Sequence, residues 1–192
     1  TVTNNKYEVA TSIRSGAYSK ENGVLAVDIA DTELSSTGGN VALTVVTTKD
    51  LVGTDNRIVV DYTIDGVAQT QVVENGAAKN TFWINLATGA LTKGITLEVT
   101  SIKVQAKFNA ITATISQAGT LSKDGALKVM NGEKEVTTSD WIDVGTKLQL
   151  VATVSTNSSG NTTLTPNSST GLNTDTKTVA KDKTNEQVTW DY

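Results

Sequence analysis

Hydrophobic and polar residues alternate with a period of two along most of the chain, and helical periodicity is hard to find. In the stretch NVALTVVTT, the side chains of Val41, Leu43 and Val45 fall on one face. The stretch DVGTKLQLVATV, residues 143–154, alternates in the same way. Because successive side chains of a β-strand point to opposite faces, this pattern predicts strands with one buried face.

Turn signals separate the alternating stretches. The segment RIVVDYTIDGVAQTQVVENG, residues 57–76, predicts two strands joined by a turn at Asp65-Gly66 and followed by a turn at Asn75-Gly76. These dipeptides supply the positive φ angles that tight hairpins require. TFWINLATG and ITLEVTSIKVQ continue the alternation up to residue 105. The chain is therefore predicted to be all-β.

A stretch near the N-terminus is repeated about one hundred residues later. ATSIRSGAYSKENGVLAV, residues 10–27, aligns with ATISQAGTLSKDGALKV, residues 113–129, with a single one-residue gap. The alignment places Asn22-Gly23 opposite Asp124-Gly125. We interpret the stretch as a hairpin at the start of each of two related β units. The alternative is chance similarity between two hairpins, because turn chemistry restricts the choice of residues.

The repeat divides the chain into units of residues 1–104 and 105–192, and the second unit differs from the first in two ways. Its residues 155–186 are rich in Asn, Ser, Thr and Gly, which predicts an exposed loop or a partly stranded excursion. QVTWDY at its end resembles IVVDY at residues 58–62, so the alignment stops before the last strands of the first unit. Either the protein is longer than this chain, or another chain supplies strands, with residues 1–9 as the proposed donor.

Composition excludes several kinds of chemistry. The chain has no cysteine and no histidine, so disulfides, Cys or His metal sites and Ser-His-Asp or Cys-His nucleophiles are impossible. The net charge of −4 comes without a basic patch, which argues against nucleic acid as a partner. No apolar run is long enough to span a membrane. We expect a protein that is not an enzyme, and because its first residue is Thr1, we expect that a preceding segment has been removed.

Three tryptophans are the candidate ligand-binding residues. Trp83 and Trp190 lie in alternating strands, so we expect both to fill cores. Trp141 lies in the polar stretch TSDWID, so we expect it to be the most exposed of the three and the candidate platform for a glycan.

Paired acids in loops are candidate calcium ligands because hard carboxylate oxygens suit that ion. The pairs are Asp28 with Asp31, Asp50 with Asp55, and Asp140 with Asp143. We predict Asp140 and Asp143 as the candidate calcium ligands, although none of the three pairs has the spacing of a helix–loop–helix calcium site. Solvated acids in turns are the alternative interpretation.

The second unit resembles a known family. VGTKLQLVATV, followed later by VTWDY, is similar to the bacterial immunoglobulin-like domains of the group-2 type, with their Gly-Thr step, Leu-x-Leu-x-Ala-x-Val strand and Val-x-Trp strand. The resemblance covers residues 144–190 best and reaches the first unit only through the internal repeat. The insert 155–186 departs from the family pattern, as does the lack of a closing half after Trp190.

The resemblance implies two tandem immunoglobulin-like β-sandwich units in an extracellular or cell-surface protein. The expected function is that of a structural module in a surface layer or a comparable assembly, with neighbouring copies of the chain as partners. Two alternatives stay open. One is an adhesin or carbohydrate-binding module that binds cell-wall or surface glycans. The other is a filament or phage subunit that is completed by strand donation.

Overall fold

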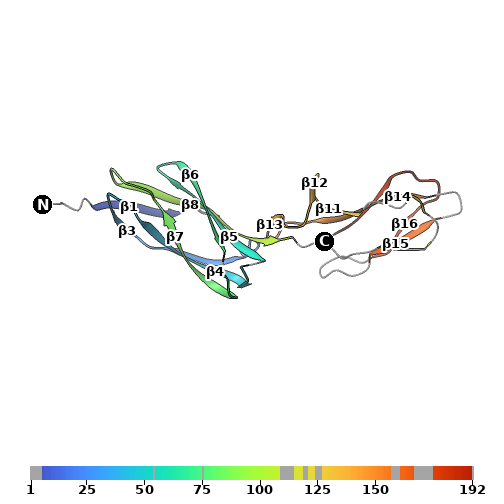
Figure 1. Ribbon diagram of the computed structural model, residues 1–192, viewed down its shortest axis with the longest axis horizontal. Coiled ribbons are helices and arrows are strands. Elements are labelled where there is room, and N and C mark those ends of the chain that lie inside the picture. The colour runs from blue at the N-terminus through green and yellow to red at the C-terminus, as the bar shows by residue number, and fades with distance from the viewer. Residues whose placement is uncertain are drawn as a thin grey trace. The chain divides into compact units, whose positions relative to one another are not determined.

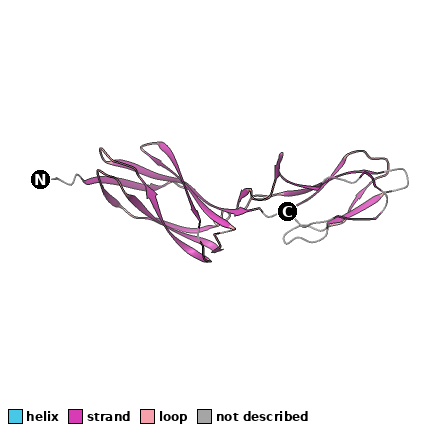
Figure 2. Cartoon of the chain, in the orientation of Figure 1, coloured by secondary structure: helices cyan, strands magenta, loops and turns pink. Residues whose placement is uncertain are grey.

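A computed structural model of the chain provides the fold. It describes residues 6–53, 55–74, 76–108, 115–118, 121–123, 127–156, 161–166 and 175–191. The regular structure of these residues is β-strand throughout (Figure 2), as the alternation predicted. Contacts divide the chain into two compact units, one of residues 1–107 with 141–145, the other of residues 108–140 with 146–192.

Unit 1 contains two sheets. Its strands are β1 (Lys6–Ile13), β2 (Val24–Ile29), β3 (Thr32–Ser35), β4 (Asn40–Leu51), β5 (Asn56–Ile64), β6 (Val67–Glu74), β7 (Lys79–Ala87), β8 (Ile95–Lys107) and β13 (Trp141–Asp143). The larger sheet has the order β3-β1-β8-β5-β6, with β13 also paired to β8, and the smaller sheet has the order β2-β4-β7. In Figure 1 the strands from β1 to β8 can be followed by their colour, which changes along the chain.

The core of unit 1 lies between these two sheets. Val41, Leu43 and Val45 of β4 are fully buried, as their alternation predicted. They belong to one hydrophobic cluster with buried side chains of the larger sheet, such as Ile58 and Ile102. The hydroxyl of Tyr62 on β5 donates a hydrogen bond of 2.8 Å to the carbonyl of Ala87 on β7, and this bond links the two sheets.

The turn at Asp65-Gly66 is the predicted hairpin. Asp65 has φ of 49° and Gly66 has φ of 82°, and the turn joins the antiparallel strands β5 and β6. Asp65 also accepts a hydrogen bond of 2.9 Å from the backbone N–H of Thr96 at the start of β8. The turn chemistry of the sequence was therefore sufficient to identify this hairpin.

The repeated stretch at residues 10–27 is not a hairpin. A tight turn does occur at Asn22-Gly23, where Gly23 has φ of 85°. However, β1 pairs with β3 and β8, whereas β2 pairs with β4, so the turn carries the chain from one sheet to the other. The prediction of a hairpin is wrong because local turn chemistry does not specify which strands pair. Asp124-Gly125 lies outside the described residues.

Unit 2 also consists of β-strands. They are β9 (Ile115–Ala118), β10 (Leu121–Lys123), β11 (Leu127–Asn131), β12 (Lys134–Val136), β14 (Gln149–Thr156), β15 (Thr162–Pro166), β16 (Lys177–Val179) and β17 (Glu186–Asp191). One sheet has the order β10-β14-β11-β12 with β17 also paired to β14, and the other has the order β16-β15-β9. Leu148, Leu150, Ala152 and Val154 are buried, as their alternation predicted.

Strand pairing in unit 2 partly follows that in unit 1. In unit 2, β14 pairs with β11 and β17, just as β4 pairs with β2 and β7 in unit 1. This pairing makes β17 the counterpart of β7, so the alignment of QVTWDY with the β5 segment IVVDY is wrong. The similarity was confined to a few residues that any buried strand of this kind shares.

The polar segment 155–186 is partly stranded in its described portions. It contains β15 and β16, which pair with each other, and β15 also pairs with β9. Thr162 and Leu164 of β15 are buried, so a segment of low hydrophobicity still contributes to the interior. The direct pairing of β15 with β9 has no equivalent between β1 and β5 of unit 1, because β8 lies between those two strands and pairs with both.

The N-terminal segment has partners within unit 1. Lys6 to Val9 pair with Ser35 to Thr32 of β3, and Val9 also pairs with Ile95 of β8. Residues 6–9 of the proposed donor strand therefore already have partners within unit 1. Thr1 to Asn5 lie outside the described residues.

Candidate functional site

The first and last strands of the segment 6–107 run parallel to each other in unit 1. Residues Val9 to Ile13 of β1 pair in register with Ile95 to Val99 of β8. Just past the end of β1, the backbone N–H of Arg14 donates a hydrogen bond of 2.9 Å to the carbonyl of Val99. The guanidinium of Arg14 contacts Glu98 at 2.6 Å. We call this set of pairs the β1–β8 ladder.

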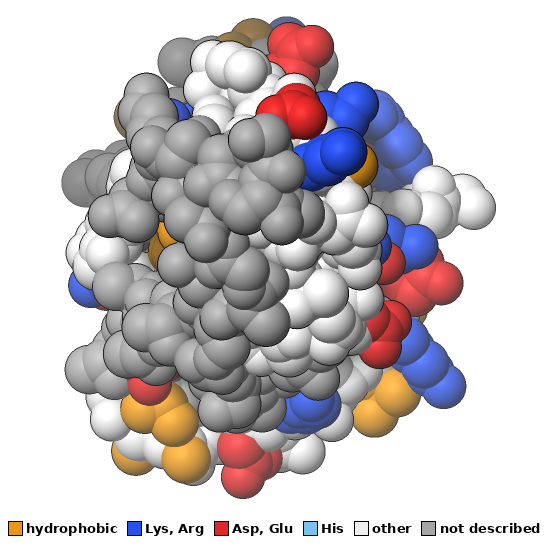
Figure 3. All heavy atoms as spheres, turned by 90° about the vertical axis from the view of Figure 1, so that its right-hand side faces the viewer, with side chains coloured by type: hydrophobic (Ala, Val, Ile, Leu, Met, Phe, Trp, Pro, Cys, Tyr) orange, Lys and Arg blue, Asp and Glu red, His pale blue; other side chains and the backbone are white. Residues whose placement is uncertain are grey.

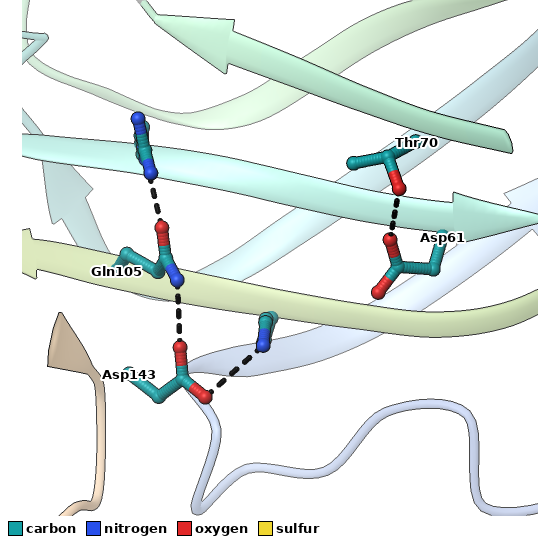
Figure 4. A network of polar contacts seen from close by, with 6 residues as sticks. Asp61, Thr70, Gln105 and Asp143 are labelled. Carbon is teal, nitrogen blue, oxygen red and sulfur yellow. Dashed lines mark hydrogen bonds and ion pairs between the residues drawn. The ribbon is translucent and has the colours of Figure 1, made fainter. Parts of the chain in front are cut away.

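A polar cluster lies on the larger sheet where β13 pairs with β8. Residues Trp141 to Asp143 pair with Lys107 to Gln105. The carboxylate of Asp143 accepts a hydrogen bond of 2.8 Å from Gln105 and one of 3.1 Å from Lys103 (Figure 4). Gln105 in turn accepts a bond of 2.8 Å from Arg57 of β5. Three strands are tied together by these contacts.

The cluster sets the ionisation of Asp143. Partial burial on its own raises the pKa of this carboxyl group. The hydrogen bonds from Gln105 and Lys103, with the positive charge of Lys103, act in the opposite direction and together outweigh burial. The pKa of Asp143 is therefore lower than its ordinary value, because its partners favour the charged form.

Asp140, the other candidate calcium ligand, has a different local role. Its carboxylate accepts hydrogen bonds of 3.0 Å and 3.3 Å from the backbone N–H and the hydroxyl of Thr137. The backbone hydrogen bond lowers the pKa of Asp140. Asp140 belongs to unit 2 and Asp143 to unit 1. Within the described residues, no group of three or more acidic side chains is placed to hold a metal ion, and calcium binding stays a prediction.

The three tryptophans have different surroundings. Trp190 is 1% exposed, as predicted, and its indole N–H donates a hydrogen bond of 2.7 Å to the carbonyl of Asp175. Trp141 is only half-buried, and the guanidinium of Arg57 lies 4.3 Å from its ring centroid. This cation–π contact covers the ring that was expected to be the open platform.

Trp83 is the exposed tryptophan, with 76% of its surface accessible. The prediction that it fills the core is wrong. Its neighbours Phe82 and Ile84 are buried, so strand parity directs Trp83 to the outer face of β7. The signal was present in TFWINLATG, since only one parity of a strand can face the core and Phe82, Ile84 and Leu86 already occupy it.

No large region of a single charge is visible among the described residues on the face drawn in Figure 3. On the face drawn in Figure 3, the acidic and basic side chains of the described residues lie next to one another. Among the described residues there is also no helix of the length and apolarity that a membrane crossing requires.

Comparisons of the chain with protein-family models, with curated proteins and with solved structures find no match. The features of unit 1 that bear on function are the β1–β8 ladder, the β13 cluster and the outer face around Trp83.

Proposed function

We propose that the chain is a load-bearing structural module of a bacterial cell-surface protein, built from two immunoglobulin-like units. A surface layer, in which neighbouring copies share mechanical load, is the assembly that fits this role best. The observation that carries the proposal is the parallel β1–β8 ladder. The Thr- and Asn-rich composition and the resemblance of residues 144–190 to surface-protein domains support the extracellular setting.

The direction of force explains why a parallel ladder suits this role. Tension applied between residues 6 and 107 pulls β1 from its N-terminal end and β8 from its C-terminal end. Because the strands are parallel, these forces slide them past each other along their length. All the hydrogen bonds of the ladder then carry the load together. In an antiparallel hairpin that is pulled at its open end, the bonds break one pair at a time.

The same geometry gives the ladder lateral support. On the side of β8 away from β1, β5 pairs with β8 from Asn56 to Ile64. On the side of β1 away from β8, β3 pairs with residues 6–9, which precede the ladder and overlap it only at Val9. β8 therefore lies inside the sheet along the ladder, and β1 is flanked on both sides where the ladder begins, which restricts peeling from that end.

A matched pair of variants tests the proposal. Lys6→Cys and Lys107→Cys provide attachment points at the two ends of the loaded strands, since the chain has no other cysteine. Into this background we would introduce Arg14→Pro, which removes the N–H bonded to Val99, and Arg14→Ala, which removes only the ion pair with Glu98. Single-molecule pulling then gives the rupture force of unit 1.

We expect Arg14→Pro to lower the rupture force and Arg14→Ala to leave it close to that of the parent, because an exposed ion pair contributes little. Equal rupture forces for all three proteins would show that the ladder does not bear the load. Denaturant unfolding of the same variants separates a loss of mechanical resistance from a general loss of stability.

A further inference from the structure

The outer face of the smaller sheet of unit 1 carries an unusually placed tryptophan. In the pairing register, Trp83 of β7 lies opposite Thr44 of β4, and Thr44 lies opposite Asp28 of β2. Burial of an indole is strongly favourable because the ring is large and mostly apolar. Unit 1 does not bury this ring, since 76% of Trp83 is accessible.

Apart from Val46, the residues around Trp83 are small or polar. The same parity on the three strands gives a face formed by Ala26, Asp28, Ala42, Thr44, Val46, Thr81 and Asn85. None of these side chains is large enough to cover an indole ring. Among the described contacts, moreover, no cation or second ring lies over Trp83, whereas Arg57 lies over Trp141. We call this surface the Trp83 face.

The size of the Trp83 face argues against a second copy of the chain as its occupant. Three strands spaced about 4.8 Å apart, each with about seven residues at about 3.3 Å, cover about 330 Å². A stable protein interface needs about 800 Å² from each partner. The face is therefore well below the size of a stable dimer interface, and a small ligand fits it better.

The charge of the face restricts the ligand further. In the segments 26–30, 40–46 and 81–87, Asp28 is the single charged side chain. Lys79 at the start of β7 places its ammonium 5.0 Å from the ring centroid of Phe82 rather than over Trp83. The segments around the indole thus offer one carboxylate and no cation, which does not favour phosphates or acidic glycans. The amide of Asn85, the hydroxyls of Thr44 and Thr81, and the carboxylate of Asp28 offer hydrogen-bond donors and acceptors around the indole. These groups match a ligand with an apolar ring face and a rim of neutral hydroxyls.

We propose that the Trp83 face binds a neutral glycan, with a sugar ring stacked on the indole and its hydroxyls bonded to the polar residues around it. This site lies on the sheet opposite to the β1–β8 ladder and does not depend on the mechanical role. It replaces Trp141 with Trp83 as the residue that contacts sugar.

The test uses the full chain and neutral hexasaccharides of glucose, mannose and N-acetylglucosamine as separate probes, with a sulfated glycan as the charged probe. The three tryptophans give three indole N–H signals in NMR spectra. We expect at least one neutral probe, at millimolar concentration, to shift the Trp83 signal while that of the buried Trp190 stays in place. The sulfated glycan is expected to shift neither.

Variants separate the stacking role from folding. Trp83→Ala is expected to weaken binding about tenfold or more and leave the unfolding midpoint unchanged, because the side chain is exposed. Trp83→Phe is expected to retain part of the affinity. Trp141→Ala serves as the matched control and is expected to bind like the parent.

Three outcomes would overturn the proposal. The first is that no neutral probe shifts the Trp83 signal. The second is binding that survives Trp83→Ala unchanged. The third is a dimer at micromolar concentration in sedimentation that Trp83→Ala dissociates, which would assign the face to a second copy.

Discussion

At the scale of single residues, Gly23 shows how tightly the link between the two sheets of unit 1 is packed. Its φ of 85° lies in the left-handed region, where L side chains are strained. A Cβ atom at this position would also lie 3.0 Å from the Cβ of Val104. The carbonyl of Gly23 accepts a hydrogen bond from Thr48, and that of Asn22 accepts one from Val104. The turn is therefore held between β4 and β8.

Gly23→Ala is predicted to be more destabilising than Gly66→Ala. The two glycines have φ of 85° and 82°, so both substitutions incur about 1–3 kcal/mol of backbone strain. A Cβ on Gly66 meets nothing within 4 Å, whereas one on Gly23 meets Val104 and adds about 1–3 kcal/mol. Urea unfolding measures the difference in the free energy of unfolding, and hydrogen exchange of the β8 amides shows whether the loss is located at this strand. Equal losses for the two variants would show that the turn is not packed against β8.

The lowered pKa of Asp143 predicts a dependence of stability on pH. A carboxyl group whose pKa is lower in the folded state stabilises the fold above its unfolded pKa, and this contribution is lost as the pH falls through the folded pKa. The parent should therefore exceed Asp143→Asn in free energy of unfolding at neutral pH, and the gap should close below the ordinary value of 3.8. Unfolding curves at several pH values provide the measurement. A gap that stays constant down to about pH 2 would contradict the assignment.

At the scale of elements, β13 belongs to unit 1 although residues 108–140 before it and residues 146–192 after it belong to unit 2. Residues 141–145 are separated from residue 107 by a segment that belongs to unit 2, yet they are part of unit 1. β13 pairs with the last residues of β8, and the N–H of Val144 donates a hydrogen bond of 2.8 Å to the carbonyl of Val104. The contacts of Trp141 with Arg57 and of Asp143 with Lys103 and Gln105 hold it there.

Trp141→Ala is predicted to loosen the end of β8. Removal of the ring that Arg57 covers should cost about 0.5–2 kcal/mol and raise the exchange rates of the amides at residues 105–107. Hydrogen exchange with residue-level detection measures this effect. Thr138→Ala, a change at an exposed residue of unit 2, is the control. Unchanged exchange at residues 105–107 in Trp141→Ala would mean that β13 is not anchored by this contact.

The same elements show what the sequence could predict. The period of two identified the buried faces of β4 and β14, and the Asp65-Gly66 dipeptide identified the β5–β6 hairpin, because both signals are local. Parity in TFWINLATG also indicates that Trp83 faces outward, although we expected Trp83 to fill the core and that prediction was wrong. Pairing between distant strands was not predictable in this way. The separation of β1 from β2, the equivalence of β17 with β7, and the position of β13 all depend on long-range contacts that no local pattern encodes.

At the scale of the whole molecule, unit 1 combines two proposed roles on its two sheets. The larger sheet contains the β1–β8 ladder, which suits the bearing of load. The smaller sheet exposes the Trp83 face, which suits the binding of a neutral glycan. A module that combines the two would attach a surface assembly to carbohydrate and transmit tension through the chain. The mechanical role is the main proposal, because it is based directly on the parallel register of β1 and β8.

The direct test of that proposal is to pull unit 1 in two directions. Cysteines at Lys6 and Lys107 load the parallel ladder in shear. Cysteines at Asn56 and Lys107 instead open the antiparallel β5–β8 pair from its end, where Asn56 lies opposite Ala106. We expect a clearly higher rupture force in the first geometry than in the second. Equal forces in the two geometries, or a lower force in the first, would contradict the mechanical role.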